Sequence, residues 1–430
     1  MLAVRSEFPL RDKGVSNASP IETIPRQRWY FVKEGFSPKL VAQALEIDEV
    51  KPGEMLLDPF SGSGTVPLAG AIAGLRTVAF VVNPFLRFLS AAKLRKARAA
   101  QFRRASDVVL QALQKPIASP LEGYSTFTRG NRWKRWLFPV SVLRAFEAGK
   151  HAAAEADGPN QRALLKLALI GAAMDCCNAM RDGKCLRYTE GWAKHQVTAA
   201  RFQDRFESRA KIISIDLEEM PLGNSSTLVL EGDARRLVGT LKEKFRICVT
   251  SPPYLNSFDY SDVYRPELFL GDFVSSTKAL MKIRLRTVRS HVQAKWDRPQ
   301  KNHFGTLYLD CIARLREYED RLWDPRLPLM VQAYFEDMET VLRGLRARAR
   351  KSASLWLVVS TSAYAGVEVP VDLILAEIGQ RSGWFLREVG VLRYLRSSSQ
   401  HVVHIDDAER KSVPLRESVV ILDAQAKRSA

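Results

Sequence analysis

The chain has 430 residues, and its 65 lysines and arginines exceed its 47 aspartates and glutamates by 18 positive charges. Hydrophobic residues make up 46% and charged residues 26%, proportions typical of a folded globular protein, which excludes a mostly disordered or fibrous chain. The sequence shows no apolar run of the roughly 20 residues that a membrane span needs and no signal-peptide core. Five cysteines form an odd and sparse set that fits reduced thiols. We therefore expect a cytoplasmic protein, nucleoid-associated if bacterial, with no membrane partner.

The excess of positive charge predicts a polyanionic partner. A protein that neutralises phosphates releases counterions and gains salt-dependent affinity, so nucleic acid is the favoured class of partner. A basic surface with no specific partner remains the alternative, because net charge alone does not fix function.

The first half of the sequence predicts an α/β stretch followed by a helical region. Residues 1–26 are predicted as an extended N-terminal arm, and 39–47 as an amphipathic helix. Short apolar strands are predicted at 55–57 and 77–82 around a helix at 66–73, a pattern typical of a parallel sheet. Further helices are predicted at 91–115, 141–154 and 161–180, which makes 95–222 a helical insertion.

The second half returns to alternating strands and helices. Strands are predicted at 227–231, 246–249, 355–360, 386–395 and 418–423, and helices at 235–244, 330–350 and 369–381. Residues 27–94 and 223–430 are therefore predicted to form one catalytic α/β domain with a Rossmann-like sheet, which the insertion at 95–222 interrupts and which includes a basic segment at 270–329. Ligands of such a sheet bind beyond the carboxyl ends of its strands.

The first motif with chemical meaning lies between a predicted strand and a predicted helix. It reads Asp58-Pro59-Phe60-Ser61-Gly62-Ser63-Gly64-Thr65. Gly62 and Gly64 remove side chains where a ligand would approach the backbone, and the amides that follow favour an anionic group at the helix N-terminus. Asp58, at the carboxyl end of the strand, could hold a ligand cation. A tight glycine turn with no ligand is the alternative.

The second motif reads Thr250-Ser251-Pro252-Pro253-Tyr254 and follows the strand at 246–249. Two prolines fix the backbone and remove two amide donors, so the neighbouring carbonyls can face outward as rigid acceptors. With the hydroxyl of Ser251 and the ring of Tyr254, they could form a slot for a planar ring that carries an exocyclic amine. A rigid turn with a core tyrosine is the alternative for this motif alone.

Together the two motifs resemble the cofactor and catalytic motifs of the DNA amino-methyltransferases, which use S-adenosylmethionine to methylate N4 of cytosine or N6 of adenine. The resemblance covers about 27–92 and 226–423 and implies a Rossmann-like class I methyltransferase sheet with a helical insertion. Gly35-Phe36-Ser37-Pro38 resembles the family's N-terminal cofactor motif, and Gly232-Asp233-Ala234-Arg235 its adenine-side loop. The cofactor-binding residues that the resemblance implies are Phe36, Ser37, Pro38, Asp58, Pro59, Phe60, Ser61, Gly62, Ser63, Gly64, Thr65, Asn83 and Asp233.

The resemblance also implies a mechanism in which Ser251, Pro252, Pro253 and Tyr254 are catalytic. Acceptors at Ser251 and at the Pro252 carbonyl would hydrogen-bond the aromatic amine and localise its lone pair toward the methyl sulfonium. Tyr254 would stack on a base flipped out of the duplex. No cysteine nucleophile is needed, which disfavours methylation of a ring carbon.

One position departs from the family pattern. An acidic residue usually ends the second strand and binds the ribose hydroxyls, but the matching residue here is Val81, followed by Val82 and Asn83. Ribose recognition could pass to Asn83 or to another residue. For the same reason, one alternative remains open, namely that the protein is a DNA-binding homologue of this family with weak catalytic activity.

The motifs indicate methylation of an amine, but they leave alternatives for the target base and for the type of nucleic acid. Serine before Pro-Pro-Tyr favours N4 of cytosine in this family, with N6 of adenine as the main alternative. RNA amino-methyltransferases share a similar motif pair, but we see no separate RNA-binding domain. We predict a site-specific enzyme of double-stranded DNA, of the restriction–modification type, with a cognate restriction endonuclease as a possible partner.

Several weaker signals complete the sequence analysis. The cysteines lack the paired spacing of a metal site, so we expect no metal. The expected DNA contacts are Arg286, Arg289, His291, Lys184 and Arg187, with a solvated basic face as the alternative. The insertion is the candidate target-recognition region, and Trp133 and Trp136 are expected to be core residues more than wedges between bases.

Overall fold

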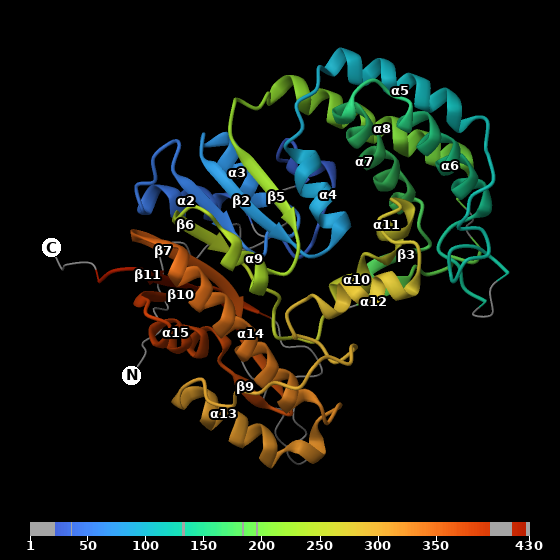
Figure 1. The fold of residues 1–430 in the computed structure, drawn as a ribbon. Helices are drawn as coiled ribbons and strands as arrows, with labels where there is room; N and C mark the ends of the chain where they lie inside the picture. The colour runs from blue at the N-terminus through green and yellow to red at the C-terminus, as the bar shows by residue number, and fades with distance from the viewer. Residues whose placement is uncertain are drawn as a thin grey trace.

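The computed structural model describes residues 22–35, 37–130, 134–182, 185–194, 197–395 and 415–426. Its centre is a seven-stranded sheet with the order β10-β11-β7-β6-β1-β2-β5 (Figure 1). The strands are β1 (Met55–Asp58), β2 (Arg76–Val81), β5 (Thr227–Glu231), β6 (Phe245–Thr250), β7 (Ala349–Ser360), β10 (Phe385–Leu395) and β11 (Leu415–Asp423). β11 is antiparallel to both of its neighbours, whereas β7, β6, β1, β2 and β5 are parallel in succession. The expected α/β, Rossmann-like sheet is confirmed.

Helices cover both faces of the sheet, as the apolar strands predicted. On one face, Leu56 and Trp356 pack with the apolar side of α2 (Pro38–Ile47) and with α3 (Thr65–Ile72). On the other face, Leu57 and Leu355 pack with α9, α14 and α15. These helices span Ala234–Thr240, Leu327–Arg348 and Val371–Arg381. Neighbouring strand residues therefore enter opposite cores, because successive side chains of a strand point to opposite faces.

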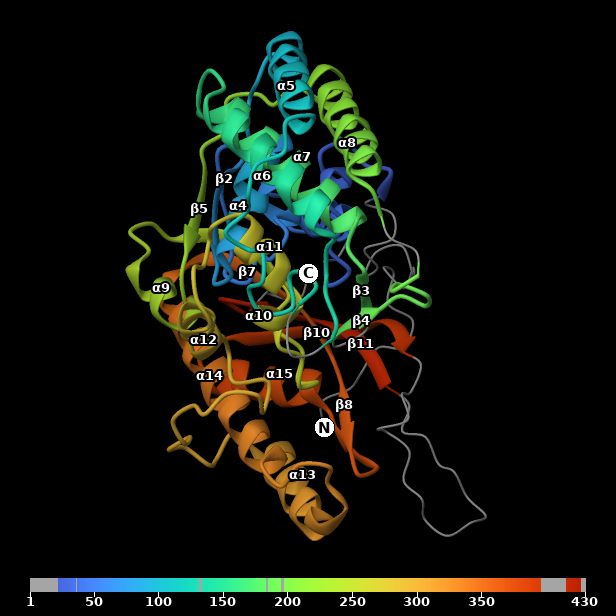
Figure 2. The same ribbon diagram turned by 90° about the vertical axis from the view of Figure 1, so that its right-hand side faces the viewer.

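The helical insertion lies beside α4 (Pro84–Lys93), away from the β10–β11 end of the sheet (Figures 1 and 2). Its helices are α5 (Ala99–Leu113), α6 (Val140–Ala154), α7 (Pro159–Asp175) and α8 (Ala199–Glu219). A small hairpin of β3 (Ala179–Asp182) and β4 (Cys185–Tyr188) follows α7. One continuous core joins the insertion to α4, so the insertion is packed against the sheet domain.

Two predicted helices have different ends in the structure. The helix predicted at 91–115 is wrong, because α4 ends at Lys93 and α5 begins only at Ala99. The buried guanidinium of Arg26 occupies this break and donates hydrogen bonds to the carbonyls of Lys93 and Arg95, both at 2.9 Å. The helix predicted at 161–180 ends at Asp175, and its last residues belong to the β3–β4 hairpin.

The segment between β6 and β7 crosses from the insertion to the far side of the sheet. It contains α10 (Tyr260–Val263), α11 (Arg265–Leu270), α12 (Thr277–Leu285) and α13 (Thr306–Glu317) before α14. A second small hairpin, β8 (Ser362–Tyr364) and β9 (Val367–Val369), follows β7. None of the helices described is long and apolar enough to cross a membrane.

The glycine-rich turn after β1 uses its two glycines differently. Gly62 and Gly64 both have positive φ, at 49° and 86°. A β-carbon on Gly62 would meet no atom closer than 4.0 Å, whereas one on Gly64 would lie 2.5 Å from Ser90 Oγ and 2.7 Å from Ser90 Cα in α4. Gly64 is therefore required for the packing of the turn against α4, and Gly62 is the glycine that leaves space on the open side.

We expect Gly64→Ala to destabilise the protein by about 2–4 kcal/mol, because left-handed backbone strain adds to a clash with the backbone of Ser90. Gly62→Ala is the matched control and should cost only about 1–2 kcal/mol of backbone strain. Urea denaturation followed by circular dichroism measures both changes. Equal losses of stability would contradict the packing role of Gly64.

Candidate active site

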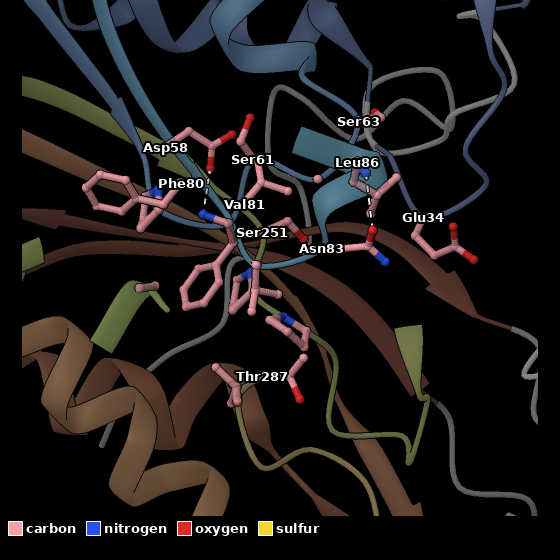
Figure 3. Close-up of a pocket in the computed structure, with 18 of the residues that line it drawn as sticks. Glu34, Asp58, Ser61, Ser63, Phe80, Val81, Asn83, Leu86, Ser251 and Thr287 are labelled. Atoms are coloured by element: carbon pink, nitrogen blue, oxygen red, sulfur yellow. Dashed lines mark hydrogen bonds between the residues drawn. The ribbon is translucent and has the colours of Figure 1, made fainter. Parts of the chain in front are cut away.

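A cavity of about 390 Å³ opens at the carboxyl ends of β1, β2 and β6 (Figure 3). Its wall includes most of the glycine-rich turn, the end of β2, the start of α9 and the turn after β6. The two chemical motifs of the sequence therefore share one cavity, at the edge of the sheet where ligands were expected.

A hydrogen bond joins the two motifs directly. The hydroxyl of Thr250, the last residue of β6, donates to Asp58 Oδ1 at 2.6 Å, and the amide of Phe60 donates to the same oxygen at 3.1 Å. Asp58 Oδ2 is buried and has no hydrogen-bond partner among the described residues. Burial raises the pKa of Asp58 to about 7, against the opposing hydrogen bond from Thr250. An unpartnered buried carboxylate oxygen of this kind fits a cationic ligand group.

The turn after β6 is held by hydrogen bonds to the strands β7 and β8. Ser251 Oγ donates to the carbonyl of Val358 in β7 at 3.1 Å, which directs its proton away and leaves its lone pairs as acceptors. The carbonyl of Leu255 accepts hydrogen bonds from Ser362 Oγ and, at 2.7 Å, from the hydroxyl of Tyr364. These contacts fix the backbone on both sides of the Pro-Pro-Tyr sequence.

The ring of Tyr254 is anchored at its far end. Its hydroxyl donates to Glu417 Oε1 in β11 at 2.6 Å. Glu417 is 2% exposed and accepts a 2.8 Å hydrogen bond from Arg393 in the neighbouring strand β10. Arg393 balances the negative charge of the Glu417 carboxylate, which accepts the charge-assisted hydrogen bond of the tyrosine.

The end of β2 carries no acid, as the sequence indicated. Val81 lines the cavity and is 4% exposed. Asn83 also lines it, but its Oδ1 caps α4 by accepting from the amides of Phe85 at 3.0 Å and Leu86 at 3.3 Å. The side-chain oxygen of Asn83 is thus committed to the helix.

Sequence reasoning missed one carboxylate of this cavity, that of Glu34. It lies in the wall on the same side as Asn83 and Leu86 (Figure 3) and accepts a hydrogen bond from the hydroxyl of Tyr264 at 2.7 Å. Glu34 directly precedes the N-terminal motif, but nothing in its local pattern distinguishes it from a surface glutamate. Only the fold, which brings α11 and the N-terminal segment together, places it here.

Asp233 caps the first turn of α9 and is held by a chain of charges. Its carboxylate accepts from the amide of Arg235 at 2.9 Å and from the guanidinium of the same residue at 2.7 Å. Arg235 also donates to Asp337 in α14 at 2.8 Å. The carboxylate is therefore fixed in the cavity wall with much of its capacity to accept hydrogen bonds already used.

The structure brings together most, but not all, of the predicted cofactor and catalytic residues. Those in the cavity wall are Asp58, Pro59, Phe60, Ser61, Gly62, Ser63, Thr65, Asn83, Asp233, Ser251, Pro252, Pro253 and Tyr254. Ser37 and Pro38 instead start α2, with the Ser37 hydroxyl accepting from the amide of Lys39 at 3.3 Å. Gly64 packs on α4, and Phe36 lies outside the described residues.

The predicted DNA contacts do not form one group. Arg286 lines the cavity with 47% of its side chain exposed, and Arg187 is 70% exposed on the β3–β4 hairpin. Lys184 lies outside the described residues, as do Trp133 and His195.

Two of the predicted phosphate contacts do not fit the structure. His291 is 2% exposed, and burial lowers its pKa, so it is not a surface cation. Arg289 donates to Asp337 and Glu336, both at 2.6 Å, and these acids satisfy its charge. Arg289 instead ties the loop that follows α12, which contains Arg286 and Thr287, to α14.

Among the described residues, no group of three or more histidine, cysteine or acidic side chains could hold a metal ion. Cys176, Cys248 and Cys311 are buried, and burial raises their thiol pKa values. They are therefore inert core residues in the described part of the chain.

Comparison with known proteins finds similarity to methyltransferases. Residues 25–117 match the family described as UPF0020, RMKL-like, methyltransferase domain. Type II methyltransferase M.AvaI of Nostoc sp. is 26% identical over 400 residues, which cover 86% of this chain and 81% of that protein. Type II methyltransferase M.BsoBI of Geobacillus stearothermophilus is 22% identical over 444 residues, covering 91% and 84%.

Solved structures add little to these matches. TrmN from Thermus thermophilus aligns with 90% of this chain and 49% of that chain, at 11% identity and a TM-score of 0.27, which is too low to carry an argument. The family match and the two relatives support an S-adenosylmethionine-dependent methyltransferase. The cavity fits that cofactor, because the buried, unpartnered oxygen of Asp58 suits its cationic amine.

We expect cofactor binding to release protons from Asp58. With a pKa of about 7, the carboxyl is about half protonated at pH 7, and a bound cation favours its ionised form. S-adenosylmethionine should therefore release up to about half a proton more from the wild type than from Asp58→Asn at pH 7. Calorimetry in two buffers of different ionisation enthalpy measures the difference, and equal proton release would contradict it.

The anchor of Tyr254 can be measured as a coupling energy. Tyr254→Phe removes the hydroxyl, Glu417→Gln removes the charge, and the double variant closes a thermodynamic cycle. A hydrogen bond to a charged group predicts a coupling of about 1.5–3 kcal/mol in urea denaturation. Additive effects of the two substitutions would show that the pair is not coupled.

Proposed function

We propose that the protein is a site-specific DNA methyltransferase that transfers a methyl group from S-adenosylmethionine to the exocyclic N4 amine of a flipped-out cytosine. The observation that carries the proposal is the single cavity in which the Asp58 turn and the Ser251–Tyr254 turn face each other. The two Type II methyltransferase relatives support DNA as the substrate.

The bound cofactor would supply an electrophilic methyl group on a sulfonium. The proposed cofactor-binding residues of this chain are those that line the cavity, with Asp58 on the cationic amine and Asp233 on the adenine side. Ribose hydroxyls require acceptors, and Glu34 offers a carboxylate at the side of the cavity near Asn83. This assignment would account for the absence of an acid at Val81.

The catalytic residues would act by position and electrostatics. Ser251 Oγ donates a hydrogen bond to the carbonyl of Val358, so its lone pairs would accept a hydrogen bond from the target amine. The carbonyl of Pro252 would accept the other, which draws the nitrogen toward tetrahedral geometry and localises its lone pair. Tyr254, held by Glu417, would stack on the flipped base. Pro253 keeps this arrangement rigid.

The alternatives differ in the base or in the polymer. The N6 group of adenine is also an exocyclic aromatic amine, so the same residues would bind and orient it. A structured RNA substrate remains the next alternative, followed by a DNA-binding homologue of weak activity. We further propose that the insertion at 95–222 recognises the target sequence and that residues 27–94 and 223–430 form the catalytic domain, preceded by an N-terminal arm at 1–26. A cognate restriction endonuclease would complete a restriction–modification pair.

We expect DNA from a host that lacks amino-methylation to acquire N4-methylcytosine when the wild-type protein is expressed. Tyr254→Ala should abolish or strongly reduce the mark, because the flipped base loses stacking of about 1–3 kcal/mol. Its affinity for S-adenosylmethionine should stay nearly unchanged. Mass spectrometry of digested genomic DNA measures the product, and calorimetry measures the cofactor.

The outcomes separate the alternatives. N6-methyladenine in place of N4-methylcytosine would keep the mechanism and correct the base. Methylated nucleosides found only in RNA would show that the substrate is RNA and not DNA. Neither mark from a soluble protein that binds the cofactor would favour the homologue of weak activity, and absence of cofactor binding would overturn the proposal.

A further inference from the structure

Three aromatic rings of the helical insertion form a cluster at the surface, outside the cavity. Trp136 meets Trp192 edge-to-face, with ring centroids 4.6 Å apart and an interplanar angle of 81°. Tyr188 lies 4.9 Å from Trp192, and all three side chains are half-buried. Each ring therefore keeps part of its surface open to solvent, where apolar area is unfavourable unless a partner covers it.

Exposed arginines surround these rings. The guanidinium carbon of Arg129 lies 5.6 Å from the centre of Trp136, and that of Arg135 lies 5.8 Å from Tyr188. Arg187 is 70% exposed and pairs with Asp182 at 2.7 Å, a surface ion pair that solvent screens strongly. We call Arg129, Arg135, Trp136, Arg187, Tyr188 and Trp192 the aromatic–arginine platform.

Stacking prepares such arginines to bind phosphate. A guanidinium that lies over an aromatic face stacks through its plane, and the N–H groups at its edge have the geometry to donate to two phosphate oxygens. The pairing with Trp136 and Tyr188 also limits the rotamers of Arg129 and Arg135 before a ligand arrives. Less conformational entropy is then lost when they bind.

A buried residue holds the platform together from below. Asn178 is 3% exposed; its amide donates to the carbonyl of Leu137 at 2.8 Å and its Nδ2 to that of Trp136 at 3.0 Å. Its own carbonyl accepts from the amide of Thr189 at 2.9 Å. The two segments that carry the rings are thus joined through the backbone and side chain of one interior residue, so the platform is a built surface.

The platform adjoins the wall of the active-site cavity. Arg181 of β3 lies over the ring of Tyr264, at 4.4 Å, and Tyr264 lines the cavity. Arg265, the next residue, donates to Ser125 Oγ at 3.3 Å and to Thr126 Oγ1 at 3.1 Å, in the segment that leads to Arg129. Figures 1 and 2 both place the β3–β4 hairpin beside α10 and α11, which follow the catalytic turn.

We propose that the aromatic–arginine platform binds the DNA next to the flipped nucleotide, with arginines on phosphates and an unstacked base on the tryptophan rings. The inference rests on the proposed function, because removal of one base from a duplex leaves its partner and its neighbours with exposed π-faces. Aromatic rings stack on such bases without regard to sequence. The platform would therefore hold the opened duplex, a task separate from reading the target sequence.

Fluorescence anisotropy with labelled duplex DNA at several salt concentrations tests the arginines in the full-length protein. Arg129→Gln combined with Arg135→Gln should weaken binding roughly tenfold or more and lower the salt slope by about 2, since two phosphate contacts are lost. Arg104→Gln, at an exposed position of α5, is the matched control and should change neither. Cofactor affinity should be unchanged in all variants.

A second measurement tests the stacking. DNA with one unpaired base should bind the wild type at least about fivefold more tightly than fully paired DNA, since one stacked base contributes about 1–3 kcal/mol. Trp136→Ala with Trp192→Ala should lose this preference while retaining the salt slope. Thermal melting shows whether the variant is folded; if it is not, the arginine variants decide alone.

The results distinguish the inference from the function on which it rests. Wild-type protein that methylates host DNA, together with arginine variants that bind DNA normally, would overturn the platform and leave the proposed function intact. Wild-type protein that neither binds nor methylates DNA would overturn the function. If structured RNA outcompetes DNA and the arginine variants lose RNA binding, the platform's assignment to DNA is wrong.

Discussion

The pairing of β1 with β6 is the constraint on which the site depends. These strands are parallel neighbours, with Leu56 opposite Ile247 and Leu57 opposite Cys248. Their carboxyl ends therefore coincide, although 192 residues separate Asp58 from Thr250, and the 2.6 Å hydrogen bond between these two residues closes the contact. A shift of one residue in this register would turn every side chain to the other face and separate the two motifs.

Rigidity of the turn after β6 comes from satisfied hydrogen bonds more than from burial. The prolines leave the turn after β6 without two amide donors, so its conformation depends on what its carbonyls and side chains find elsewhere. A carbonyl of β7 accepts a hydrogen bond from Ser251, a hydroxyl of β8 donates to the carbonyl of Leu255, and Glu417 of β11 accepts from Tyr254. Each contact comes from a different strand, which fixes the turn in three directions before a substrate arrives.

The parts that the sequence could predict are those set by local pattern and by topology. Apolar strands followed by a glycine turn predict a parallel sheet with ligands at its carboxyl ends. The resemblance to the amino-methyltransferases then implied that Asp58 and Ser251 share one site. The errors share a different cause, because they depend on partners far away in the chain. Arg26 ends α4 from 67 residues away, and Asp337 neutralises Arg289 from 48 residues away. Local charge made Arg289 resemble a phosphate contact, whereas its environment makes it a support of the cavity wall.

The two sides of the molecule differ in how they use charge. Several charged groups around the cavity are partly buried in mutual pairs, such as Asp233 with Arg235 and Glu417 with Arg393, so these pairs fix geometry and add little net field. On the insertion, Arg129 and Arg135 are exposed and lie over aromatic rings. Exposed charge acts at long range and is sensitive to salt, which suits the capture of a polyanion. A buried ion pair is hardly screened, which suits the positioning of reacting groups. If the proposed function and platform hold, the fold would separate attraction of the partner from the chemistry, and the contact of Arg181 with Tyr264 joins the two regions.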